Sequence, residues 1–156
     1  MRRIDREVTD KTAIEEFIKK EQILRVAFYE DGEIYIVPVN YGYVSENDRY
    51  SFYFHGAKAG RKYELSKSRP TVGFEIDGAY QLLSGDSACD YSARFQSVIG
   101  TGTLEIVADM AEKVKGLNAL MRQISPKNQW SFSEKVLEAT AVFRLDVQKL
   151  SCKRKM

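Results

Sequence analysis

The chain has 156 residues, with 24 Lys and Arg against 22 Asp and Glu, so its formal net charge is only +2. That balance argues against a nucleic-acid-binding domain, which usually carries a concentrated basic field. Two cysteines and one histidine exclude a disulfide framework and a zinc site, and no segment approaches the roughly 20 apolar residues of a membrane span, so we expect one cytoplasmic domain over residues 1–156 with no metal.

The first third of the chain predicts a helix followed by a meander of strands. Apolar residues recur at helical spacing after a capping box that begins at Thr12, which predicts an amphipathic helix over residues 10–20. β-Branched and aromatic residues then predict antiparallel strands joined by polar turns, the first of which carries an Asp-Gly hairpin signal. These strands cover residues 23–29, 34–44 and 49–55.

The rest of the chain predicts three helices and three further strands. The helices cover residues 61–68, 109–124 and 133–139, the first ending before Pro70 and the others capped by Asp109 and Ser133. The strands cover residues 71–77, 93–108 and 140–147, with a loop over 78–92 and a basic tail at 153–155. Gly100 and Gly102 indicate a bulge or a close backbone approach. Six strands with short connections predict a mainly β fold, an antiparallel barrel with flanking helices.

Residues 53 to 62 read Tyr-Phe-His-Gly-Ala-Lys-Ala-Gly-Arg-Lys and have the composition of an anion site. Glycines let backbone N–H groups approach a phosphate closely, and Lys58, Arg61 and Lys62 supply positive charge at the start of a helix. Spacings of three and four residues would place these cations on one helix face. The alternative is a solvated charged face. His55 is either a structural residue at a strand end or part of the anion site.

Two further segments have features of a ligand site. Pro38 interrupts an apolar strand, so backbone groups of residues 39–41 and the amide of Asn40 could face a ring edge with alternating donors and acceptors. The alternative is a bulged edge strand. In the segment 95–100, a hydroxyl and backbone N–H groups precede a glycine on a strand, where a phosphate or ribityl chain could lie, or no ligand at all.

Taken together and in this order, these segments resemble a known family. Val37-Pro-Val-Asn-Tyr-Gly-Tyr43, the stretch 53–62, Cys89-Asp-Tyr-Ser and Phe95-Gln-Ser-Val-Ile-Gly-Thr-Gly102 are similar to segments of the flavin-binding split-barrel proteins related to pyridoxamine 5'-phosphate oxidase. The branch that contains the nitroimidazole-resistance proteins is the most similar. The resemblance covers nearly the whole chain.

The resemblance implies a six-stranded split β-barrel that forms a homodimer and binds FMN in two clefts at the subunit interface. Carried over by residue, it predicts contacts of the ring with Val39, Asn40 and Tyr41, and of the ribityl and phosphate with Phe54, His55, Gly56, Lys58, Arg61 and Lys62. It also predicts that Ser97, Val98, Ile99 and Gly100 complete the cleft. Trp130 either stacks on the flavin or packs on protein.

The chain departs from true pyridoxamine phosphate oxidases because it has no histidine after His55 and lacks their C-terminal substrate motif. We therefore expect an FMN-dependent oxidoreductase that passes electrons from a reduced nicotinamide to a small acceptor such as a nitroaromatic, with His55 as the candidate catalytic residue. The alternatives are a flavin-binding module for storage or sensing, a nucleic-acid patch formed by residues 58–62 and 153–155, and a haem-binding variant with His55 as axial ligand.

Overall fold

The structure is a computed structural model that describes residues 3–47, 49–127 and 130–156. Its elements are η1 (Ile4–Arg6), β1 (Glu7–Val8), α1 (Lys11–Lys20), β2 (Ile23–Glu30), β3 (Glu33–Asn40), β4 (Gly42–Glu46), β5 (Arg49–Ala57), α2 (Arg61–Ser66), β6 (Thr71–Leu83), β7 (Ser92–Ile106), α3 (Met110–Ile124), α4 (Glu134–Ala139) and β8 (Thr140–Lys155). The predicted mainly β class with flanking helices is confirmed.

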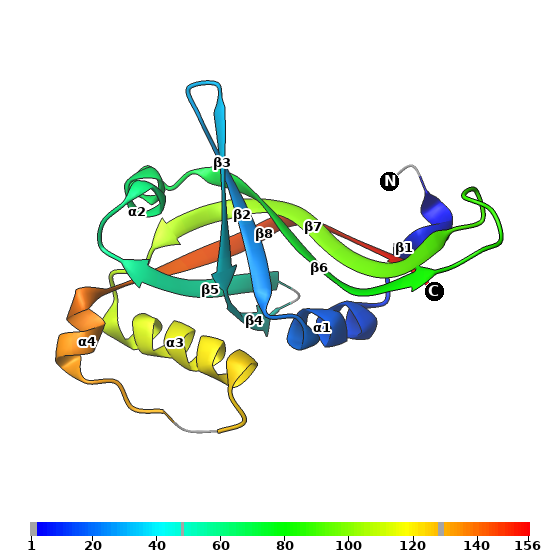
Figure 1. Cartoon of the computed structure of the whole chain (residues 1–156). Coiled ribbons are helices and arrows are strands. Elements are labelled where there is room, and N and C mark those ends of the chain that lie inside the picture. The colour runs from blue at the N-terminus through cyan, green and yellow to red at the C-terminus, as the bar shows by residue number, and fades with distance from the viewer. Residues whose placement is uncertain (1–2, 48, 128–129) are drawn as a thin grey trace.

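One antiparallel sheet forms the body of the molecule. Its strand order is β3-β2-β6-β7-β8-β5-β4, and β1 adds to β8. The sheet curls so that β3 also contacts β5, although no hydrogen-bonded ladder joins these two strands among the pairings described. The barrel therefore remains split between β3 and β5. Figure 1 shows the β2–β3 hairpin projecting from this body on the side of α2, and α3 and α4 lying below β5.

Two apolar clusters hold the fold together. The larger fills the curled sheet and is closed by α1, whose Ile14, Phe17 and Ile18 are buried. The smaller cluster lies on the other face of β5 and β8, between these strands and the helices α3 and α4. Alternation along β2 explains the first cluster, because Leu24, Val26 and Phe28 point inward while their neighbours face out.

Several local predictions are confirmed by backbone geometry. Asp31 and Gly32 both have positive φ, 50° and 88°, as a two-residue hairpin turn between β2 and β3 requires. The pairing of β7 with β8 shifts register between Thr101 and Gly102, but the extra residue is Gln148, so the bulge lies in β8 opposite the glycines and not in the strand for which it was predicted. A Cβ on Gly100 would lie 2.1 Å from the carbonyl oxygen of Lys149, so the predicted close approach is also present.

The structure has strand over most of the predicted range 34–44, but the strand is interrupted at Tyr41 and not at Pro38. The Tyr41 ring is fully buried and its hydroxyl donates to the Ile18 carbonyl oxygen at 2.6 Å. Gly42 then packs so tightly on α3 that a Cβ there would lie 2.1 Å from the Ala119 carbonyl carbon. Two strands, β3 and β4, result, and Pro38 lies in β3 at the edge of the sheet, where a missing N–H is tolerated.

Other boundaries also differ from the predictions. Asp10, not Thr12, caps α1, since its Oδ1 accepts from the Ala13 N–H at 2.7 Å. The predicted loop 78–92 shortens to 84–91 because β6 continues to Leu83 and β7 begins at Ser92. The last strand does not end at Val147, and the basic tail is its paired continuation. The bulge in β8 breaks the two-residue period there, which hides the continuation from a pattern search.

Candidate functional site

The segment from the end of β5 to the start of α2 lies at the split of the barrel. We call residues 55–62 the phosphate cradle, after the role that the sequence predicts for them. Gly60 lies directly before α2 and has a φ of 90°, a backbone conformation that residues other than glycine rarely adopt. Its carbonyl oxygen accepts a hydrogen bond from the Glu64 N–H at 3.0 Å. Because α2 begins only at Arg61, Lys58 precedes the helix, so the three predicted cations do not share one helix face.

Lys62 is the best positioned cation of the phosphate cradle. Its Nζ lies 5.5 Å from the ring centroid of Phe54 and 5.1 Å from that of Phe143, and these two rings stack at 5.1 Å. The same ammonium donates to the His55 carbonyl oxygen at 3.3 Å. Partial burial lowers the pKa of Lys62. A half-buried ammonium held on two aromatic rings is well suited to bind an anion.

Gly56 has no side chain, and this leaves room for the Lys62 ammonium beside β5. A Cβ at residue 56 would lie 2.9 Å from the Lys62 Nζ, closer than real Cβ atoms approach other groups. The sequence predicts that this glycine leaves room for a group to approach the backbone closely. In this structure the Lys62 side chain fills that room. A ligand phosphate would meet the ammonium at this point.

Arg61 reaches across the split to β3. Its guanidinium nitrogen lies 3.0 Å from a carboxylate oxygen of Glu33, and its Cζ lies 5.0 Å from the ring centroid of Tyr35. Neither Glu33 nor Tyr35 was predicted as a site residue, and neither was Phe143. The sequence indicates only that these three residues lie on strands. It does not indicate which residues of distant elements they contact.

His55 lies on the exposed side of β5, opposite Val142 of β8. Loss of hydration among the surrounding atoms, and secondarily the Lys62 ammonium, lower the pKa of His55 below its usual value of 6.5. The imidazole is therefore mainly neutral at neutral pH, with one ring nitrogen as donor and the other as acceptor.

The predicted ring-binding residues at the end of β3 differ in their exposure. Val39 is half-buried and packs on the barrel core, while Asn40 is exposed and donates from Nδ2 to the Gln22 carbonyl oxygen at 3.2 Å. Tyr41 points into the core, so only its backbone could meet a ligand. Phe54 is also a core residue, and it acts on the site through Lys62.

The predicted residues on β7 lie far from the phosphate cradle within one chain. Gly56 pairs with Ala141 of β8, whereas Gly100 pairs with Leu150 of the same strand. Nine positions along a strand correspond to about 30 Å at the usual rise per residue. Val98 is buried in the core, Ile99 is exposed, Ser97 is half-buried, and Gly100 packs on Phe74. One chain does not bring these residues to the cradle.

Trp130 lies in the segment between α3 and α4. It is half-buried, its indole Nε1 is buried with no hydrogen-bond partner among the described residues, and the Lys127 ammonium lies 5.3 Å from its ring centroid. None of these contacts is with the phosphate cradle. Its predicted place at the flavin stays a prediction.

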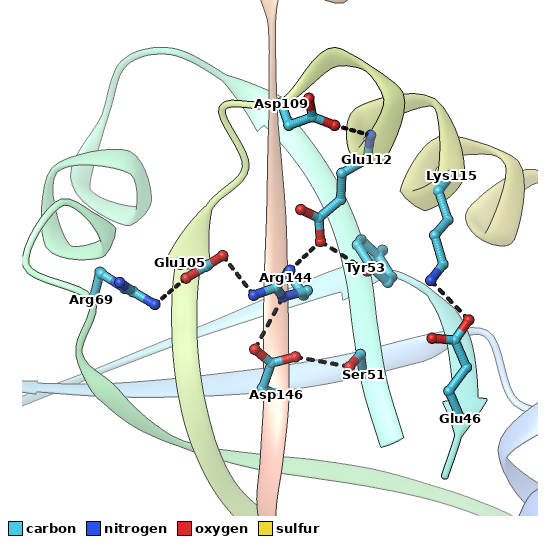
Figure 2. Close-up of polar contacts among 10 residues, drawn as sticks. All are labelled: Glu46, Ser51, Tyr53, Arg69, Glu105, Asp109, Glu112, Lys115, Arg144 and Asp146. Atoms are coloured by element: carbon cyan, nitrogen blue, oxygen red, sulfur yellow. Dashed lines mark hydrogen bonds and ion pairs between the residues drawn. The ribbon is translucent and has the colours of Figure 1, made fainter. Parts of the chain in front are cut away.

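A separate polar cluster lies on the outer face of β5, β7 and β8, beside α3 (Figure 2). Arg144 forms ion pairs with Glu105 at 2.7 Å, with Asp146 at 3.0 Å and with Glu112. Burial alone would lower the pKa of Arg144, but the three carboxylates outweigh it and raise that pKa. Glu112 also accepts from the hydroxyl of Tyr53 at 3.2 Å.

We call this set, Arg144 with its three carboxylates, the Arg144 network. Burial, together with Glu112, raises the pKa of Tyr53 to about 12. A hollow of about 810 Å³ opens beside the network between Arg49 and Leu150, and none of the cavities described is lined by residues of the phosphate cradle. Its walls are polar and open, and the charges of the network are paired with one another. We interpret the network as structural, because it holds α3 on the sheet.

The sequence profile of the pyridoxamine 5'-phosphate oxidase family matches residues 10–154, nearly the whole chain. The chain belongs to this family. Among curated protein sequences, none matches it. Within the described residues, no helix has the length and apolarity needed to cross a bilayer, and no group of three His, Cys, Asp or Glu side chains is arranged to hold a metal ion.

Solved structures place the family member among split barrels. A candidate 5-nitroimidazole antibiotic resistance protein from Bacteroides thetaiotaomicron is 29% identical with a TM-score of 0.81, over 95% of this chain and 86% of that one. The flavocytochrome Anf3 from Azotobacter vinelandii is 23% identical with a TM-score of 0.81, over 100% and 72%. An FAD and heme binding protein from Mycobacterium smegmatis is 20% identical with a TM-score of 0.84, over 96% and 73%. The predicted family and fold class are thereby confirmed.

Proposed function

We propose that the chain is an FMN-binding flavoprotein that passes electrons from a reduced nicotinamide to a small acceptor such as a nitroaromatic. The observation that carries the proposal is the phosphate cradle, where Lys62 is held on two aromatic rings and Arg61 lies next to it. The names of related structures, a flavocytochrome and an FAD and heme binding protein, support a flavin as the ligand.

The residues present fit a flavin nucleotide. A phosphate monoester needs positive charge and N–H donors that can approach closely, and the cradle offers two cations beside Gly56 and Gly60. The exposed Asn40 and the backbone at residues 39–41, where the strand ends, can meet a ring edge of alternating donors and acceptors. When bound, the flavin supplies the redox chemistry, and the protein supplies position and electrostatics.

Four residues of the cradle have a defined task in this proposal. Lys62 and Arg61 bind the phosphate, and Gly56 leaves room for the Lys62 ammonium, which a Cβ at residue 56 would crowd. His55, neutral because of its lowered pKa, can donate or accept a hydrogen bond beside the ribityl chain without adding charge. Tyr41 acts indirectly, because its buried ring holds the end of β3 against α1.

A homodimer completes the proposed site. Residues 97–100 lie about 30–40 Å from Gly56 along β8, so a second copy would have to bring them to the cradle. The outer face of the sheet is suited to such a contact, since Tyr29, Ile34, Ile36 and Ile99 are between 54% and 72% exposed on the same face. Exposed apolar strips of this kind usually mark interaction surfaces.

We place the reaction in the cytoplasm, where reduced nicotinamides are available and where thiols stay reduced. Cys89 and Cys152 are both free, which agrees with that setting. A flavin-binding module for storage or sensing would use the same cradle, and turnover alone separates the two functions.

Mixing the flavin-loaded protein with NADH or NADPH in the absence of oxygen tests turnover. We expect the visible flavin absorption bands to bleach within seconds to minutes with at least one donor, and to return when a nitroaromatic is added. Bound flavin that neither donor bleaches would contradict the oxidoreductase and leave the binding module. A protein that binds no flavin would contradict both.

A further inference from the structure

The tip of the β2–β3 hairpin contacts the phosphate cradle at Arg61, which pairs with Glu33 and lies over the Tyr35 ring. Glu33 begins β3 directly after the Asp31-Gly32 turn, and its Oε2 lies 3.0 Å from a guanidinium nitrogen of Arg61. The pair joins the hairpin to the start of α2 across the split of the barrel, on the side of the molecule where Figure 1 shows the hairpin projecting. It links two elements that share no strand ladder.

This ion pair uses the charge that a phosphate would need. A guanidinium presents its N–H donors in a fixed plane, and carboxylates and phosphates both bind that plane with two oxygens. A phosphate bound at Arg61 would also lie within a few ångströms of the Glu33 carboxylate. Like charges at that separation repel, so phosphate and Glu33 cannot both bind Arg61 favourably.

We propose that Glu33 is an intramolecular competitor for the phosphate at Arg61, and that it thereby sets the affinity of the site for phosphorylated flavins. This inference rests on the proposed flavin-binding function. Binding of the phosphate releases Glu33 from Arg61, and loss of the phosphate restores the ion pair.

The exposure of the pair shows that this exchange is easy. The side chain of Arg61 is 46% exposed and that of Glu33 is 74% exposed, so water screens their attraction. An exposed ion pair of this kind changes an equilibrium by about two- to fivefold. Tyr35 keeps the guanidinium in place during the exchange, because its ring packs 5.0 Å from the Arg61 Cζ. Glu33 therefore weakens phosphate binding by competing for Arg61. When Glu33 leaves, Arg61 stays in place on the Tyr35 ring.

The test compares Glu33→Gln with Glu30→Gln in the full chain. Glu30 is the cross-strand partner of Glu33 on the same hairpin, and it forms no ion pair with Arg61 among the described contacts. Both variants remove one negative charge from the tip. Titration of the protein into FMN, followed by flavin fluorescence, should show an affinity about two- to fivefold higher for Glu33→Gln than for wild type. Glu30→Gln should show less than half of this gain, and riboflavin should bind equally well to all three proteins.

The background Arg61→Ala distinguishes competition from a general effect of charge. In that background Glu33→Gln should no longer change FMN affinity. Equal gains from the two Gln variants, a loss of affinity in Glu33→Gln, or a gain that persists without Arg61 would each overturn the inference while leaving the proposed function intact. Failure of wild type and both variants to bind FMN or riboflavin would remove the proposed function, and this inference with it.

Discussion

Replacing both Arg61 and Lys62 with Ala should lower the affinity for FMN about 100-fold or more, since hydrogen bonds to charged groups contribute roughly 1.5–3 kcal/mol each. Lys62 should account for the larger part, because its ammonium is fixed by Phe54 and Phe143, whereas Arg61 must first leave Glu33. Riboflavin, which lacks the phosphate, should bind the variant and the wild type alike. Fluorescence titration with the two flavins measures both effects.

Two further variants make this result specific. Lys67→Ala removes a cation near α2 whose ammonium pairs with Glu64, outside the cradle, so it should leave FMN affinity unchanged. Lys62→Met keeps an apolar stem on the two rings and removes only the charge, which separates lost binding from lost packing. Unchanged FMN affinity in the double Ala variant would show that the phosphate does not bind at residues 61 and 62.

Replacing Arg144 with Met should lower the free energy of unfolding by about 2–3 kcal/mol. Asp146 and Glu112 would then lose their guanidinium partner and Glu105 would keep only its ion pair with Arg69, so Glu112 would no longer hold α3 to β8. Complete removal of one partner from a buried ion pair costs about 3–5 kcal/mol, and we expect less here because the Arg144 side chain is 24% exposed. Urea unfolding, followed by the fluorescence of Trp130, measures the change.

Lys115→Met is the matched control for the Arg144 variant. It also removes a cation from an ion pair of α3, that with Glu46, but both side chains are well exposed at 44% and 63%. Exposed pairs contribute about 0–1 kcal/mol, so this variant should unfold close to wild type. Equal midpoints for the two variants would contradict the structural role of the Arg144 network. FMN affinity should survive in both, since neither residue belongs to the cradle.

Local signals in the sequence were sufficient for most of the fold. The Asp31-Gly32 turn and the caps at Asp109 and Ser133 each act within a few residues, and the structure places them as predicted. The break at Tyr41 could not be predicted, because its cause is the packing of Gly42 on α3, some 75 residues further along the chain. Tertiary packing of this kind overrides strand propensity.

The candidate site was only partly predictable for the same reason. Residues 55–62 are contiguous, so composition alone indicated a phosphate site. Glu33, Tyr35 and Phe143 reach the cradle from β3 and β8, and nothing in their sequence neighbourhoods distinguishes them from other strand residues. The residues on β7 were predicted by resemblance alone, and a single chain leaves them distant from the cradle.

His55 offers the most direct test of the claim that a phosphate binds in this cradle. It is the only histidine of the chain, so its imidazole proton resonance can be assigned without ambiguity. In the protein without ligand its pKa lies below 6.5. The unfolded chain therefore binds the His55 proton more readily than the folded one. The contribution of neutral His55 to the free energy of unfolding is complete above the pKa that His55 has in the unfolded chain, and it is lost as the pH falls through the pKa that His55 has in the folded protein.

A phosphate dianion at Lys62 would raise the His55 pKa, because it offsets the charge of the Lys62 ammonium and negative charge nearby favours the imidazolium. The decisive measurement is an NMR titration of His55 in the wild-type protein, alone and saturated with FMN or with riboflavin. We predict that FMN raises the His55 pKa clearly and that riboflavin does not. An identical His55 titration in all three samples would contradict the location of the phosphate, and with it the account of this chain as an FMN-binding protein that uses residues 55–62.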